Sequence, residues 1–240
     1  MEWGRAKSIL IITFLLLNLL LGYQLWISNI NLLNPFFGGN EMIQETRKLL
    51  EEKGIEIRGE IPTEKLNLNQ ITIDFDEKVQ KDISFELISP VDVDEIISGE
   101  VNKTFLDEIE DFDQYQYDEV VSDENQQVFN QLYENLPLFD VQLKLYGSEG
   151  QLTHYDQQVA IVTPDITEEE QEVLSAPLVI HLLAEDYLKQ GEVIEDIQLG
   201  YQGFESNPQA LFPKWRIALG SGDIYYVHAF TGKVEVIQSI

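Results

Sequence analysis

Residues 141–162 read VQLKLYGSEGQLTHYDQQVAIV, and this stretch indicates the fold most clearly. Val141, Leu143 and Leu145 alternate with more polar side chains, which is the period of a strand with one buried face. Gly-Ser-Glu-Gly at 147–150 is typical of a reversal of the chain, and a returning run follows it. We therefore expect two antiparallel strands joined by a tight turn.

The same alternation of apolar and polar residues recurs on both sides of this hairpin. Strands are expected in seven further segments, namely 55–61, 70–75, 83–89, 193–204, 214–219, 224–230 and 233–237. The last four are separated by glycine-containing turns, as in an antiparallel meander. These segments are therefore expected to form antiparallel sheets.

Helical periodicity is present in three segments. Apolar residues recur at helical spacing in 41–53, and Gly54 follows as a C-terminal cap. A second helix is expected over 122–137, because its apolar residues form one stripe that ends at a proline. A third is expected over 167–191, where a capping box opens the segment and Pro177 introduces a kink or divides the segment into two abutting helices.

These elements twice follow the order of one helix and then antiparallel strands. We therefore expect an α+β fold in which tandem helix-plus-antiparallel-sheet units follow one another along the chain. The first unit is expected at 41–162 and the second at 163–240.

The beginning of the chain differs in character from the rest. Residues 9–27 read ILIITFLLLNLLLGYQLWI, and nineteen residues at a helical rise span about 28 Å, close to the hydrocarbon thickness of a bilayer. We expect a transmembrane helix here, between an N-terminus at 1–8 and a juxtamembrane linker at 28–40. A cleaved signal peptide is the alternative, but its apolar run is normally shorter and ends in small residues.

Charged and aromatic residues predict the orientation of this segment. Arg5 and Lys7 precede it and the next basic residue is Arg47, so the positive-inside rule places the N-terminus in the cytoplasm. Tyr23 and Trp26 lie near the far end, where their rings suit the outer headgroup level. We expect a single-pass protein of the cell membrane with an extracellular C-terminal domain.

Polar residues inside the apolar segment are candidates for contact with a partner helix. Asn18 lies near its middle, and Gly22 lies four residues later on the same helical face. Together they offer close approach of two backbones and an amide that can hydrogen-bond across helices. Thr13 is a third candidate, and the alternative for Asn18 is a polar residue tolerated in lipid.

The charge of the chain excludes several classes of partner. Its 43 acidic and 15 basic residues give a formal net charge of -28, which excludes nucleic-acid binding and disfavours anionic lipid surfaces. There is no cysteine, so disulfides, thiolate nucleophiles and Cys-ligated zinc are excluded. Residues 107–124 hold nine acids and no base, and we interpret them as a solvated loop because they lack the spacing of an EF-hand.

Motifs for catalysis or cofactor binding are absent from the sequence. His154, His181 and His228 have no metal-ligand spacing, and we expect them in packing or surface positions. A serine nucleophile elbow, a phosphate-binding loop and a dinucleotide fingerprint are also missing. We therefore expect no enzymatic activity, no catalytic residues, no metal and no cofactor.

Both ends of the chain resemble a known family. The opening residues in question are Met1-Glu2-Trp3, Lys7-Ser8-Ile9, Phe14-Leu15, Asn18 and Tyr23-Gln24. The C-terminal ones are Gly200-Tyr201, Pro213, Trp215, Tyr225-Tyr226 and Thr231-Gly232-Lys233-Val234. They resemble the YycI (WalI) family of regulatory proteins of the YycFG (WalRK) two-component system, and the C-terminal pattern is also similar to YycH-like and PepSY-like sheet modules.

This resemblance implies a membrane-anchored accessory protein that associates with a sensor histidine kinase (YycG/WalK-like) and a YycH (WalH)-like protein. Such a protein adjusts kinase output, and thereby cell-wall metabolism, through its transmembrane helix, which here is 9–27. The alternative is a membrane-tethered PepSY-like module that restrains an extracellular peptidase or wall hydrolase. A sensor of a small extracellular ligand is a third alternative, and it needs a pocket.

Overall fold

The computed structural model describes residues 7, 10–22, 39–75, 84–99, 101, 103–165, 169–203 and 209–237. The density of internal contacts divides the chain into two units, 1–45 and 46–240. Every described strand belongs to the second unit. The structure therefore has a mixed α+β fold with few helices in the described ranges, while the predicted tandem units 41–162 and 163–240 stay a prediction.

The first unit contains an apolar helix. Residues 10–22 are helical, and all of their side chains are exposed. Within the ranges that the structure describes, no helix combines the length and the hydropathy of a membrane span. The predicted transmembrane helix at 9–27 is thus not confirmed, and its residues 9 and 23–27 lie outside the described residues, as does most of the predicted linker.

The second unit is built on a sheet that has twelve strands in the described part of the chain. They are β1 (Glu56–Ile57), β3 (Ile71–Phe75), β4 (Phe85–Asp92), β5 (Tyr115–Tyr117), β6 (Gln126–Tyr133), β7 (Leu136–Ser148), β8 (Gln151–Gln157), β9 (Ala160–Pro164), β11 (Val193–Gly203), β12 (Gln209–Leu219), β13 (Ile224–His228) and β14 (Val234–Ile237). The other elements are α2 (Gly39–Lys53), α3 (Val93–Ser98), α4 (Lys103–Glu108), α5 (Ala176–Asp186), the short 3-10 helix Phe112–Gln114, and the pair of β2 (Asn67–Leu68) with β10 (Gln171–Glu172).

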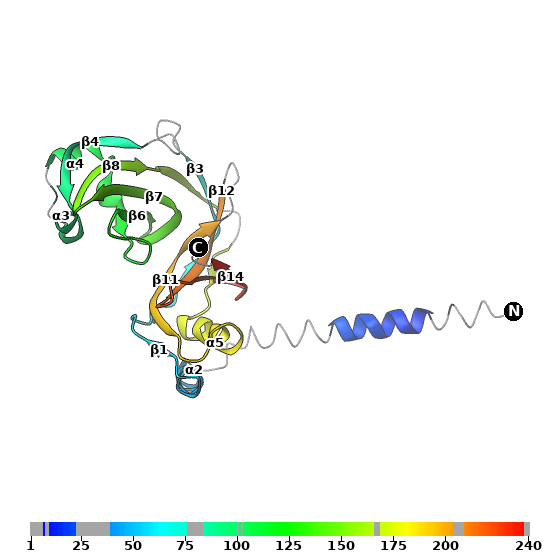
Figure 1. Cartoon of the computed structure of the whole chain (residues 1–240). Helices are drawn as coiled ribbons and strands as arrows, with labels where there is room; N and C mark the ends of the chain where they lie inside the picture. Colours follow the sequence, from blue (N-terminus) through cyan, green and yellow to red (C-terminus); the bar gives the residue numbers. More distant parts are fainter. Residues whose placement is uncertain are drawn as a thin grey trace. The chain divides into compact units, whose positions relative to one another are not determined.

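Strand β7 joins two groups of strands (Figure 1). On one side it pairs with β6 along most of its length. On the other side it pairs antiparallel with β8 from Leu143 onward, but parallel with β11 at Leu138. The neighbour of β7 on this edge therefore changes from β11 to β8 between Leu138 and Leu143. We call the place where β8 and β11 diverge from β7 at these residues the fork at β7.

The predicted hairpin is confirmed as β7 and β8, with the turn at Glu149 and Gly150 in the left-handed region. Gly147 is required next to this turn, because a Cβ there would lie 1.9 Å from the carbonyl oxygen of Gln151. The run that the sequence predicts as one returning strand is divided. Its end is β9, which pairs with β3 instead of β7.

Other predicted elements are confirmed with shifted ends. They are α2 with its cap at Gly54, β3, β4, β11, β12, β13 and β14. Strand β12 begins five residues before the predicted 214, at Gln209, because it also pairs there with β3. The strand predicted at 55–61 is reduced to β1, which pairs with the first two residues of β11.

The helix predicted at 122–137 is wrong, because this segment forms β6 and the start of β7. Its apolar stripe fits helical spacing only because β6 is buried on both faces and so lacks the alternation of a surface strand. Neighbours β5 and β7 satisfy the backbone of β6 on both edges. Glu134 and Asn135, both at positive φ, make the tight turn that the helix prediction overlooked.

The helix predicted at 167–191 is also largely wrong, because only α5 is helical. Pro177 lies in the first turn of α5, where its missing N–H costs no hydrogen bond, so it starts the helix instead of kinking it. Residues 169–175 before it are not helical, and 166–168 lie outside the described residues.

Three clusters of buried apolar residues hold together the part of the second unit that the structure describes. The first packs α5 against β11, β12 and β13, and the second packs α3 and α4 against β4 to β8. The third lies where β3, β7, β9, β11 and β12 meet. The fork at β7 is thus bordered by a packed core.

Candidate functional site

The residues predicted to contact a partner helix lie on the helix at 10–22. Thr13, Asn18 and Gly22 are all exposed there, and a Cβ on Gly22 would meet no atom within 4 Å. Of the residues predicted to orient the segment in a membrane, Lys7 is exposed. The others, Arg5, Tyr23 and Trp26, lie outside the described residues. The roles of all these residues stay predictions.

The three histidines occupy separate places in the second unit. His154 is exposed on β8, whereas His181 of α5 and His228 of β13 are half-buried. Burial, aided by the charge of nearby Lys214, lowers the pKa of His228 below its usual value of 6.5. Within the described ranges, no group of three His, Asp or Glu side chains could hold a metal ion.

Strand β12 carries two buried cations on the face opposite α5. Lys214 and Arg216 are each only 2% exposed. The alternate residues Trp215 and Ile217 point to the other face and belong to the core cluster of α5. The sequence analysis predicted a half-buried strand at 214–219, but not that its charged side chains would be enclosed.

Arg216 is held by carboxylates from two different parts of the sequence. Its Nη1 donates to Asp118, which lies between β5 and β6 and is 4% exposed. Its Nη2 contacts Asp196 of β11 at 3.3 Å, and its guanidinium lies 4.7 Å from the ring centre of Phe139. Burial alone would lower the pKa of Arg216, but the hydrogen bond and charge of Asp118 outweigh it and the net shift is upward.

The acidic segment 107–124 is therefore not wholly the solvated loop that the sequence predicts. Besides pairing with Arg216, Asp118 accepts a hydrogen bond from Asn130 of β6 at 2.5 Å. Tyr115 in the same segment is buried, and that burial raises its pKa to about 12. The sequence gives no sign of the ion pair between Asp118 and Arg216, because Asp118 is one of nine acids in this segment and nothing in the pattern distinguishes it.

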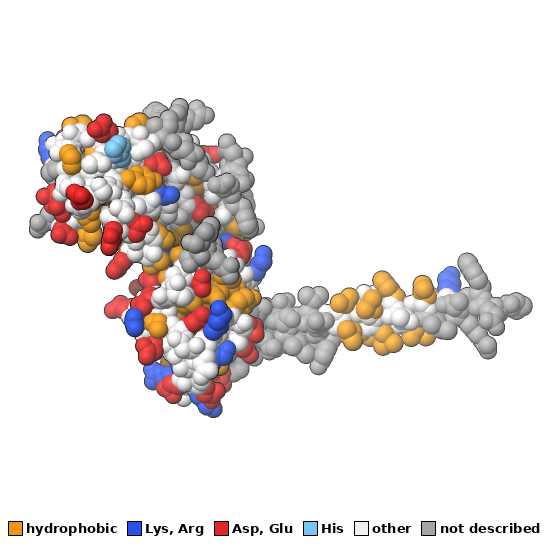
Figure 2. All heavy atoms as spheres, in the orientation of Figure 1, with side chains coloured by type: hydrophobic (Ala, Val, Ile, Leu, Met, Phe, Trp, Pro, Cys, Tyr) orange, Lys and Arg blue, Asp and Glu red, His pale blue; other side chains and the backbone are white. Residues whose placement is uncertain are grey.

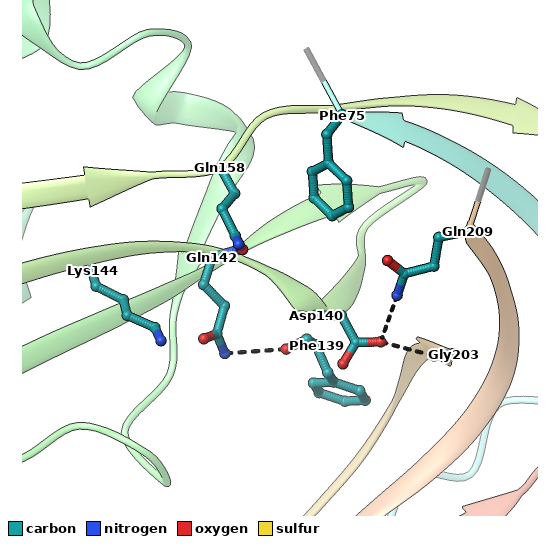
Figure 3. Close-up of a pocket in the computed structure, with 8 residues that line it drawn as sticks. All are labelled: Phe75, Phe139, Asp140, Gln142, Lys144, Gln158, Gly203 and Gln209. Atoms are coloured by element: carbon teal, nitrogen blue, oxygen red, sulfur yellow. Dashed lines mark hydrogen bonds between the residues drawn. The ribbon is translucent and has the colours of Figure 1, made fainter. Parts of the chain in front are cut away.

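A pocket of about 260 Å³ lies in the fork at β7 (Figure 3). Among the described residues, strand β7 supplies half of the wall, and the rest comes from the ends of β3 and β11, the start of β12 and Gln158, which lies between β8 and β9. The lining residues are Phe75, Phe139, Asp140, Gln142, Lys144, Gln158, Gly203 and Gln209. Polar side chains therefore dominate the pocket, with two phenyl rings beside them.

Hydrogen bonds hold the walls of this pocket in place. Asp140 Oδ2 accepts from the backbone N–H of Gly203 at 2.8 Å and from Gln209 Nε2 at 3.4 Å, which ties β7 to β11 and β12. Across the fork, the backbone N–H of Gln142 donates to Gln158 Oε1 at 3.1 Å, and the backbone N–H of Gln158 donates to the carbonyl of Gln142 at 2.9 Å. These groups suit binding, because they are donors and acceptors in fixed positions.

Sequence reasoning missed this pocket. The polar residues of β7 alternate with apolar ones, and this pattern predicts a side of the strand that faces solvent. These polar residues are enclosed because β12 pairs nearby with β3 and β11. Such pairing joins segments that lie far apart in the sequence. The one signal in the local sequence is that Asp140, Gln142 and Lys144 occupy one face of the strand, and on that face no apolar residue lies between them.

Comparison with known proteins identifies a family. A family model described as YycI protein matches residues 39–230. No curated protein matches the sequence. A solved structure with similarity is an uncharacterized protein from Eubacterium rectale ATCC 33656 at 1.45 Å resolution, 14% identical, with a TM-score of 0.36. That similarity covers 50% of this chain and 45% of the other, which is less than half of its length.

The family match spans the whole second unit up to β13 and thus more than half of the chain. It agrees with the resemblance seen in the sequence, which rested on residues at both ends. YycI proteins are regulatory accessory proteins of the YycFG two-component system and are not known as enzymes. The chain therefore belongs to the YycI family.

Proposed function

We propose that this protein is a membrane-anchored accessory regulator of a YycG (WalK)-like sensor histidine kinase, and that it acts with a YycH (WalH)-like protein. In this proposal residues 9–27 cross the cell membrane, with the N-terminus in the cytoplasm and the C-terminal domain outside. Membership of the YycI family carries the proposal, because YycI proteins are accessory proteins of the YycFG two-component system.

The apolar helix supports the membrane anchor. Ten large apolar side chains between residues 10 and 21 are 47–72% exposed, and Figure 2 shows orange, hydrophobic side chains along the visible face of this helix. Removing one such side chain from water is worth about 1.5–3 kcal/mol. Ten of them together strongly favour a helix surrounded by lipid tails or by other apolar helices over one in water.

Regulation by this helix requires that it bind two states of the kinase with different free energies. A coupling of about 1–3 kcal/mol changes an equilibrium by roughly 5–150-fold. One interhelical hydrogen bond in a membrane is worth about 0.6–2 kcal/mol. A single amide such as that of Asn18 therefore supplies a contact of the required size, provided that the kinase accepts it in one state only.

Replacing Asn18 by Leu is expected to lower recovery of the kinase with this protein by roughly threefold to thirtyfold. The reason is the loss of the interhelical hydrogen bond at the centre of the span. The measurement is crosslinking in native membranes, followed by quantitative mass spectrometry of the purified complex at matched protein levels. Unchanged recovery, together with unchanged kinase output, would count against the role of Asn18.

A composition-matched control separates the position of the amide from its polarity. The double substitution Leu16→Asn with Asn18→Leu moves the amide by two residues, about 200° around the helix, to the opposite face. Both side chains are exposed on the described helix, so neither change disturbs packing within the chain. We expect the double variant to bind as weakly as Asn18→Leu, whereas full recovery would contradict a directed contact.

A further inference from the structure

The fork at β7 leaves one edge of that strand without a neighbouring strand over a short distance. Between Leu138, which pairs with β11, and Leu143, which pairs with β8, this edge faces the pocket. The pocket volume of about 260 Å³ lies just below the range of about 300–1,000 Å³ that is usual for small-molecule sites, so it suits a small ligand.

Opposite charges lie at the two ends of the pocket wall that β7 provides. Asp140 and Lys144 point to the same side of the strand, four residues and thus about 13 Å apart along it, with Gln142 between them. Figure 3 shows their side chains along one row. Lys144 is half-buried and has no hydrogen bond or ion pair with another described residue, so its ammonium is available to a ligand.

The amides between these charges are only partly used. Gln142 donates from Nε2 to the carbonyl of Phe139 at 3.1 Å, but its Oε1 accepts no hydrogen bond from a described residue. Gln158 accepts through Oε1, whereas its Nε2 donates to no described residue. One acceptor and one donor are thus left at the pocket, which matches the N–H and C=O of a peptide group.

The charge pattern distinguishes among classes of ligand. A simple anion would be attracted by Lys144 but repelled by Asp140, and a simple cation would meet the reverse. A neutral sugar would use neither of the two charges. A zwitterion that carries its two charges at opposite ends complements both residues, and three extended residues span about 10 Å.

We propose that this pocket binds a short peptide of about three small residues with free amino and carboxyl ends. The amino group lies at Asp140 and the carboxylate at Lys144. The free amide groups of Gln142 and Gln158 hydrogen-bond the peptide group between them. This inference goes beyond the proposed kinase regulation and does not depend on it.

Calorimetric titration of the full chain in detergent micelles with trialanine tests the proposal. We expect saturable binding of one peptide per chain, with a dissociation constant of roughly 0.1–1 mM for a ligand of this size. N-acetyl-trialanine and trialanine amide, which each lack one terminal charge, are expected to bind about tenfold more weakly. Absence of saturable binding, or equal affinity for free and blocked peptides, would overturn it.

The substitution Lys144→Gln assigns the carboxylate end. We expect it to weaken trialanine about tenfold and to leave the affinity for trialanine amide unchanged, because the amide already lacks the group that Lys144 binds. Lys103→Gln, at an exposed lysine of α4, is the control and should change neither affinity. An equal loss of affinity for both peptides, or no loss for trialanine, would contradict this orientation. Circular dichroism verifies that each variant is folded.

Discussion

Replacing Asp118 by Asn is expected to lower the free energy of unfolding by about 3–5 kcal/mol. The substitution keeps the shape of the side chain but leaves the buried guanidinium of Arg216 without its main counter-charge, and an uncompensated buried charge costs that much. Asp196 cannot replace Asp118, because 37% of the Asp196 side chain is exposed to solvent, whereas only 2% of the Asp118 side chain is. Denaturant unfolding of the full chain in micelles, followed by fluorescence, measures the change.

A double-mutant cycle tests whether the pair acts as a unit. Arg216→Met alone leaves Asp118 buried without a counter-charge. The two changes together remove both charges, so they should lower the free energy of unfolding by clearly less than the sum of the two single losses. Arg58→Met is the matched control, because Arg58 pairs with Glu195 at 2.7 Å but with 62% of its side chain exposed, and we expect a loss below about 1 kcal/mol. Additive losses at Asp118 and Arg216 would contradict a coupled pair.

Replacing Trp215 by Ala is expected to lower the free energy of unfolding by about 3–5 kcal/mol. Trp215 is 2% exposed and packs in the cluster of α5 and β11, so its removal leaves a large cavity. Its Nε1 also donates to the carbonyl of Leu174 at 2.8 Å. The measurement is chemical denaturation of the full chain in micelles, followed by circular dichroism because the substitution removes a fluorophore.

Two further variants divide this effect into packing and hydrogen bonding. Trp215→Phe keeps most of the apolar volume but leaves the Leu174 carbonyl without its donor, for an expected loss of about 1–3 kcal/mol. Ile88→Ala removes a large apolar side chain that is 77% exposed and should change stability by less than about 0.5 kcal/mol. A loss at Trp215→Ala no larger than that at Ile88→Ala would contradict the packing account.

Elements with a local signal could be predicted from the sequence. The hairpin of β7 and β8 and helix α2 each have one more exposed side, so period and caps are visible in the residues themselves. Strand β12 is buried on both faces, but Lys214 and Arg216 alternate with apolar residues, so its period is still visible. Strand β6 has two buried faces and lost that signal. The start of α5 is misplaced because the sequence analysis expects Pro177 to interrupt a longer helix, although proline is suited to a first helical turn.

The candidate site lay beyond sequence reasoning because it depends on long-range pairing. Asp140 meets the backbone of Gly203 and the side chain of Gln209, which are more than sixty residues away in the sequence. Arg216 meets Asp118 across 98 residues. Neither partner could be selected from 43 acidic residues by composition or spacing, because only the order of strands in the sheet brings them together.

The central claim, that this YycI protein regulates a sensor kinase through its apolar N-terminal helix, is tested most directly in native membranes. The measurement is crosslinking, affinity purification and mass spectrometry of the full chain beside a version in which residues 9–27 are replaced by polyleucine. We expect a YycG (WalK)-like kinase and a YycH (WalH)-like protein with the full chain, and loss of both with polyleucine. Recovery of a peptidase or wall hydrolase from both versions, without the kinase, would contradict the claim and would indicate a tethered binding module.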